Sequence, residues 1–167
     1  MKIQKSLIAV VAGTLFSLTV QAQTYNVSLN YGASPYASPV LIPGNTLDYN
    51  GYNDWSFTVT SSTIAADNYN ITGNYGAGSF NGLVFVQQSG DPISDVTLNP
   101  ASTFPGLVAG DVTFTASEIK VNLEGLTATP GSTVLLDITS NSVPEPTTVA
   151  LAGLGSLALL AFRRKQA

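Results

Sequence analysis

The stretch LDYNGYNDW at residues 47–55 gathers the side chains of this sequence that are best suited to bind a sugar. The flat rings of Tyr49, Tyr52 and Trp55 could stack on the apolar faces of a sugar, while neighbouring amides and carboxylates bond its hydroxyl groups. This interpretation predicts a carbohydrate-binding face. The alternative is that the aromatic side chains are ordinary residues of a β fold and that the asparagines form turns, and we favour this alternative.

The same stretch holds four side chains whose oxygen atoms are suitable ligands for Ca²⁺, which takes six to eight oxygens. It lacks the spacing and the final glutamate of an EF-hand loop, so solvated turn residues are the simpler interpretation. We therefore predict no metal site. The four side chains are Asp48, Asn50, Asn53 and Asp54.

Catalysis has few residue types to draw on, because the sequence contains no cysteine and no histidine. Thiolate nucleophiles, imidazole bases and the usual zinc and copper ligands are therefore missing. Glycoside hydrolysis needs only two carboxylates, but acidic residues such as Asp91, Asp95 and Asp111 occur singly at strand ends and turns. Lys120 alone is a weak base for a serine or threonine nucleophile. We predict no catalytic residue and no cofactor, and keep a two-carboxylate glycosidase as the enzymatic alternative.

The first 22 residues have the layout of a secretory signal peptide. Lys2 and Lys5 precede an almost continuously apolar run over residues 7–20, and Val20-Gln21-Ala22 has the small-residue spacing of a signal-peptidase site. We predict a signal helix over residues 1–22 that signal peptidase removes between Ala22 and Gln23. An uncleaved N-terminal anchor is the alternative.

Residues 143–167 combine a proline-rich turn, an apolar run and a basic end. The turn is Val143, Pro144, Glu145 and Pro146, and the bases are Arg163, Arg164 and Lys165. The sixteen uncharged residues between them would form a helix of roughly 24 Å, which is short of the roughly 30 Å hydrocarbon core. The bases can cover part of this difference by snorkelling, and they would stay cytoplasmic. We therefore predict a transmembrane-like hydrophobic helix that halts the chain at its last step through a membrane, with a plain anchor as the alternative.

Between these apolar ends, residues 23–142 form the predicted ectodomain. This segment carries nine acidic side chains and one basic side chain, for a net charge of −8. Such a surface repels the phosphates of nucleic acids and anionic lipids, so nucleic-acid binding is excluded.

The ectodomain shows no helical periodicity. Short alternating runs rich in Val, Ile, Thr, Phe and Tyr are separated by Gly, Asn, Asp and Pro, which is the pattern of β-strands joined by turns. We therefore predict an all-β fold, specifically an antiparallel β-sandwich. The predicted strands are residues 24–31, 54–61, 68–75, 81–88, 94–99, 111–116, 118–125 and 132–139.

Alternation along these runs also predicts which side chains face the core. A chain of this length can bury a hydrophobic core without disulfides. The predicted inward-facing residues are Phe57, Val59, Val84, Val86, Phe114, Ile119, Val121, Leu123, Val134 and Leu136.

Two segments of the ectodomain resemble one another. Residues 25–36 (YNVSLNYGASPY) and 69–80 (YNITGNYGAGSF) align without gaps and are identical at six of twelve positions. One interpretation is a pair of equivalent hairpins that present a duplicated polar face. The other is coincidence in a Tyr/Asn-rich composition, or two structurally matched strands of one sandwich, and we favour it.

The order of VPEP, an apolar run interrupted by glycine, and RRK strongly resembles the PEP-CTERM sorting signal. The resemblance implies export by a Gram-negative bacterium that makes exopolysaccharide. It also implies that an exosortase, a membrane transpeptidase-like enzyme, recognises Val143–Pro146 and removes the tail, as happens with other removable hydrophobic signals.

These observations lead us to expect a non-enzymatic surface or extracellular-matrix protein. Its partners would be signal peptidase, an exosortase-like sorting enzyme, the membrane before processing, and a polysaccharide of the exopolysaccharide or biofilm. The alternative is a carbohydrate-binding module that uses Tyr49, Tyr52 and Trp55.

Overall fold

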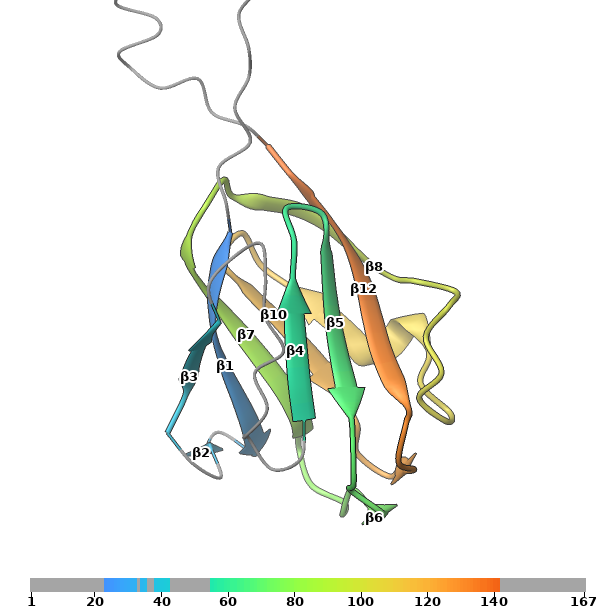
Figure 1. Cartoon of the computed structure of the whole chain (residues 1–167). Coiled ribbons are helices and arrows are strands. Elements are labelled where there is room, and N and C mark those ends of the chain that lie inside the picture. Colours follow the sequence, from blue (N-terminus) through green and yellow to red (C-terminus); the bar gives the residue numbers. More distant parts are fainter. Residues whose placement is uncertain (1–22, 33, 36–37, 43–54, 142–167) are drawn as a thin grey trace, which may run out of the picture.

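The structure, a computed structural model, describes residues 23–32, 34–35, 38–42 and 55–141. Antiparallel sheets dominate this part of the chain (Figure 1), and its helical content is one 3₁₀ turn, η1 (Ala109–Asp111). The prediction of an all-β antiparallel fold is confirmed. The signal helix and the C-terminal hydrophobic helix that we predicted lie outside the described residues. Within the described residues, no helix is long and apolar enough to span a membrane.

Two sheets pack against each other. The larger has the order β2 (Ser34–Pro35), β1 (Thr24–Tyr31), β7 (Asn81–Ser89), β10 (Glu118–Asn122) and β9 (Val112–Phe114), and β3 (Val40–Ile42) also pairs with β1. The smaller has the order β4 (Trp55–Val59), β5 (Thr63–Asn68), β12 (Thr133–Ser140) and β8 (Ile93–Leu98). A separate short pair joins β6 (Gly73–Asn74) to β11 (Thr127–Ala128).

The hydrophobic core lies between the two sheets. Along β1, Tyr25, Val27 and Leu29 alternate inward, and Val27 lies directly opposite Phe85 of β7. Side chains of the smaller sheet, among them Leu136, belong to the same buried cluster. Full burial of each large apolar side chain contributes about 1.5–3 kcal/mol to folding. The alternation of β1 therefore holds this strand of the larger sheet against the smaller sheet.

The turn between β4 and β5 shows how local sequence sets the topology. In TSST, the backbone N–H of Thr60 donates to the carbonyl of Thr63 at 2.9 Å. The Thr60 hydroxyl oxygen accepts the backbone N–H groups of Ser62 at 3.2 Å and Thr63 at 2.9 Å. Hydroxyl groups that bond nearby backbone in this way stabilise turns. The hairpin therefore closes without glycine or proline.

Seven of the ten predicted inward-facing residues lie in the core cluster, and three do not. In β7 it is Leu83 and Phe85 that face the core. Val84 is buried outside the core cluster, and Val86 is 37% exposed. Phe114, at the end of the edge strand β9, is 39% exposed. The prediction for β7 was wrong because GLVFV is apolar at both alternating positions, so the pattern did not reveal which face is buried.

Two strand predictions also need correction. β5 was not predicted, since TIAADN is poor in strong β-formers, yet Ile64, Ala66 and Asn68 alternate inward as a strand requires. Residues 68–75 were predicted as one strand, but Asn68 ends β5, residues 69–72 form a loop, and only Gly73–Asn74 pair as β6.

The two similar segments do not form equivalent hairpins. The first forms β1, whereas the second is mostly loop. Tyr25 is fully buried and its counterpart Tyr69 is 44% exposed. The segments instead contact each other through Tyr31 and Gly32 of the first segment. The Tyr31 hydroxyl donates to the Ala77 carbonyl at 2.8 Å, and the Gly32 N–H donates to the Phe80 carbonyl at 2.7 Å.

Candidate functional site

The start of β1 and the end of β12 meet at one end of the sandwich, while β6 lies at the opposite end (Figure 1). We call the first of these the terminal end and define it by Gln23, Gly90, Pro92, Ser140 and Asn141. We call the other the far end. The two segments expected to interact with the membrane, residues 1–22 and 143–167, both connect to the terminal end.

Gln23, the predicted first residue after signal cleavage, is fully buried at the terminal end. Its side-chain amide Nε2 donates to the hydroxyl of Ser140, and its Oε1 accepts the hydroxyl proton of Tyr25. Burial raises the pKa of Tyr25 to about 12, because the tyrosinate would lose its hydration. The buried amide of Gln23 thus has a hydrogen-bond partner at both its nitrogen and its oxygen.

Gly90 provides the space that Gln23 occupies. A Cβ at Gly90 would lie 2.8 Å from the Gln23 Cγ and 3.2 Å from its Cα. Gly90 also has a φ of +116°, which only glycine adopts readily. The turn SGDP therefore both reverses the chain after β7 and leaves room for the buried glutamine.

The last described residue, Asn141, is also held at the terminal end by a hydrogen bond. The backbone N–H of Asn141 donates to the carbonyl of Pro92 at 3.0 Å. Only Ser142 separates Asn141 from Val143, the first of the predicted sorting residues. The sorting residues Val143, Pro144, Glu145 and Pro146 and the bases Arg163, Arg164 and Lys165 lie outside the described residues, as does Ala22.

Of the three predicted glycan-binding residues, the structure describes one, Trp55. Trp55 is fully buried, with its ring stacked on Phe57 at 6.4 Å and on Phe104 at 6.0 Å between ring centroids. A ring enclosed on both sides in this way cannot stack on a sugar from solvent, so we correct the prediction for Trp55 and assign it to the core. Tyr49 and Tyr52 lie outside the described residues, and their role stays a prediction.

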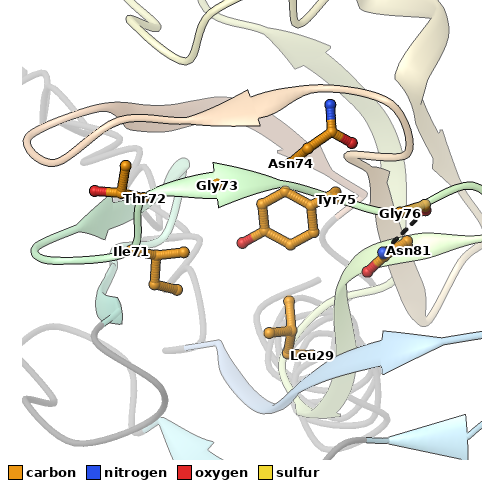
Figure 2. A pocket seen from close by; sticks show the side chains of 8 residues that line it. All are labelled: Leu29, Ile71, Thr72, Gly73, Asn74, Tyr75, Gly76 and Asn81. Carbon is orange, nitrogen blue, oxygen red and sulfur yellow. Dashed lines mark hydrogen bonds between the residues drawn. The ribbon is translucent and has the colours of Figure 1, made fainter.

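A pocket of about 320 Å³ opens at the far end (Figure 2). Its size is at the lower limit for small-molecule sites. Leu29 and Ile71 provide apolar surface, Thr72 and Asn74 provide polar groups, and the Asn81 side chain donates to the Gly76 carbonyl at 3.1 Å. Sequence reasoning missed this pocket because it depends on the long-range pairing of β6 with β11. The described residues that line it are Leu29, Ile71, Thr72, Gly73, Asn74, Tyr75, Gly76 and Asn81.

Several acidic side chains of the described part of the chain make structural contacts. Both carboxylate oxygens of Asp137 accept the Asn99 amide, at 3.0 and 2.8 Å, and Asp67 accepts the Thr133 hydroxyl at 2.5 Å. Lys120, the weak base considered above, forms an ion pair with Glu118 at 2.9 Å.

Asp95 and Asp137 are the pair most relevant to a two-carboxylate mechanism. Asp137 lies opposite Thr97, so Asp95 is its diagonal neighbour on the outer face of the smaller sheet. Diagonal neighbours have Cα atoms roughly 7–8 Å apart, and a two-carboxylate mechanism would also need both carboxyl groups to flank the bond to be cut. However, neither aspartate lines the pocket, whose described lining contains no acidic residue. Among the described residues, no group of three or more acidic side chains could hold a metal ion.

The comparisons with known proteins give a match for the segment that follows Asn141. The family model for the PEP-CTERM protein-sorting motif matches residues 142–165. The chain carries a PEP-CTERM sorting motif. The matched range contains all seven of the predicted sorting residues and membrane-stop bases, from Val143 to Lys165. No curated protein and no solved structure matches the chain.

The PEP-CTERM motif implies an exported protein that an exosortase-type enzyme sorts in a Gram-negative bacterium. It assigns a role to the tail and none to the sandwich. Because the match begins at residue 142, one residue after the Asn141–Pro92 hydrogen bond, the sorting motif follows the folded body without a linker.

Proposed function

We propose that this protein is a non-enzymatic component of the cell surface or extracellular matrix, delivered through its PEP-CTERM motif and associated with exopolysaccharide or biofilm. The match of the motif to residues 142–165 is the observation that carries the proposal. The motif stands directly after a folded β-rich body, so recognition and cutting of the tail would leave that body intact.

The delivery takes place in steps. Signal peptidase removes residues 1–22, and the apolar tail holds the chain in the inner membrane with Arg163, Arg164 and Lys165 on the cytoplasmic side. An exosortase-type enzyme then recognises Val143–Pro146 and separates the body from the tail. The body finally resides at the cell surface or in the matrix.

The small choice of side chains suited to catalysis supports a non-enzymatic role. The sequence contains neither cysteine nor histidine. Asp67 and Asp137 are engaged in hydrogen bonds within the smaller sheet, and Glu118 pairs with Lys120. The far-end pocket has no acidic residue among its described lining residues.

Replacement of the sorting prolines tests the proposal. The variant Pro144→Ala/Pro146→Ala should stay in the membrane fraction with its C-terminal tail attached, whereas the wild-type body reaches the surface or the medium. Pro100→Ala is the matched control, because Pro100 is an exposed turn proline of the body. Fractionation with an antibody against the body reports both. Unchanged distribution of the double variant would show that the motif does not direct delivery.

A carbohydrate-binding module is the second candidate, and the far-end pocket favours it. Thr72 and Asn74 supply an exposed hydroxyl and amide beside apolar surface, which suits a neutral sugar. Affinity electrophoresis in gels that contain the native exopolysaccharide tests this function. Retardation that Thr72→Ala/Asn74→Ala abolishes would support it, and equal mobility with and without polysaccharide would exclude it.

A further inference from the structure

Gln23 connects the two ends of the folded body. Its amide reaches the Ser140 hydroxyl, 117 residues later in the sequence, as well as the hydroxyl of Tyr25. The next residue, Thr24, is already paired with Ser89, and their hydroxyl groups lie 2.8 Å apart. The docked position of Gln23 therefore requires that β1, β7 and the end of β12 are all in place.

A protease needs the residues on both sides of the bond it cuts to be accessible and extended in its active site. Susceptibility is therefore judged from the burial and hydrogen bonding of the affected backbone. Gln23 immediately follows the predicted signal-peptidase bond, and it is fully buried against Gly90. A docked Gln23 cannot simultaneously occupy the active site of signal peptidase.

We propose that signal-peptide removal and docking of Gln23 exclude each other, so that the bond before Gln23 is cut while the start of β1 is open. Gln23 then docks and closes the terminal end. This inference rests on the proposed function, because it takes the bond before Gln23 as the site of signal cleavage.

The position of Ser140 sets the time available for cleavage. A secretory chain crosses the membrane with its signal end first, and Ser140 belongs to the last strand of the body. The hydroxyl that Gln23 binds thus reaches the exported side only after nearly all of the body has crossed. Until Ser140 arrives, Gln23 cannot dock, and the bond before it stays accessible to signal peptidase. A body that completes its fold first is cut only through transient opening, at a rate that follows the population of the open form.

The test uses the full-length precursor and purified signal peptidase. Precursor in detergent is either allowed to refold before the peptidase is added or diluted from urea directly into the peptidase. The initial rate of formation of the product that begins at Gln23 is followed by mass spectrometry. We expect the refolded precursor to be cut at least tenfold more slowly than the freshly diluted one.

Variants that open the terminal end leave both residues at the cut bond unchanged. Ser140→Ala removes one partner of the Gln23 amide, and Tyr25→Phe removes the other while it keeps the buried ring. Each should speed cutting of the refolded precursor severalfold and leave the freshly diluted rate unchanged. Ser61→Ala, an exposed serine of the β4–β5 turn, is the control and should have no effect.

The outcomes separate this inference from the proposed function. Equal cutting of refolded and freshly diluted precursor would overturn the inference and leave export intact. If neither form is cut before Gln23, the proposed signal cleavage is wrong, and the inference is overturned with it. Circular dichroism of the refolded variants establishes that a faster rate reflects an open end and not a global failure to fold.

Discussion

The hydroxyl group of Tyr25 couples stability to pH. Burial raises the pKa of this residue to about 12 in the folded protein, against about 10 in an unfolded chain. The unfolded state therefore loses its proton first as pH rises. The stabilisation is fully present below pH 10 and disappears between pH 10 and pH 12.

We predict that this effect lowers the free energy of unfolding by about 2 kcal/mol between pH 9 and pH 12. Urea denaturation of the mature protein at several pH values, followed by circular dichroism, measures the change. Tyr25→Phe should remove most of the dependence in this range, and Tyr69→Phe, which alters an exposed tyrosine, should keep it. An identical pH dependence in Tyr25→Phe would rule out Tyr25 as the cause.

Gly82 is required for the close approach of β7 and β10. A Cβ at this position would collide with the carbonyl oxygen of Val121 and would lie 3.0 Å from the Leu123 nitrogen. Because both are backbone atoms, the strands would have to separate. We predict that Gly82→Ala destabilises the fold by about 1–3 kcal/mol, as overpacking does elsewhere. Gly110→Ala, whose Cβ would meet nothing within 4 Å, should shift the urea midpoint far less, and equal shifts would contradict this account.

Among the elements, β4 depends on how Trp55 packs. The indole lies between Phe57 of the same strand and Phe104 of the segment after β8, so it joins the smaller sheet to that segment. Among the residues that the structure describes, the buried indole Nε1 has no hydrogen-bond partner. Replacement by another aromatic ring therefore loses little polar stabilisation, whereas truncation leaves a cavity.

We predict that Trp55→Ala costs about 3–5 kcal/mol of stability and that Trp55→Phe costs clearly less, because phenylalanine keeps an aromatic ring at this position and leaves a smaller cavity. Thermal unfolding followed by far-ultraviolet circular dichroism measures both. Neither variant that remains folded should change binding to exopolysaccharide, because the indole does not reach solvent. Loss of polysaccharide binding in folded Trp55→Phe would restore the original interpretation of this residue.

Local patterns sufficed for some elements and not for others. Residues 24–31 were predicted with the bounds of β1, since alternation and β-forming residues agree there. In β7 both alternating positions are apolar, and only the packing of the second sheet decides that Leu83 and Phe85 face inward. β5 is a strand because it lies between β4 and β12, an arrangement that TIAADN does not encode by itself.

The candidate sites also differ in whether a local sequence pattern is enough to predict them. The sorting motif is a linear pattern that needs no fold to be recognised, so sequence reasoning found it. The burial of Trp55 and the far-end pocket depend on contacts between distant segments. The docking of Gln23 depends on Ser140, 117 residues away, which no local pattern links to it.

At the scale of the whole molecule, the arrangement of its ends matters most. Gln23 and Asn141 lie at the same end of the sandwich, where β1 starts and β12 ends (Figure 1), and the sorting motif follows Asn141 at once. The far end, marked by β6, lies opposite (Figure 1), and residues around β6 line the pocket (Figure 2).

The intact mass of the protein from native cells, with and without the sorting enzyme, tests the central claim most directly. We predict a chain that begins at Gln23 and ends within residues 143–146 when the enzyme is present. Without it, we predict a chain that begins at Gln23 and runs through Ala167. A mass that includes Ala167 in both strains would contradict processing at the PEP-CTERM motif and would make the tail a permanent anchor.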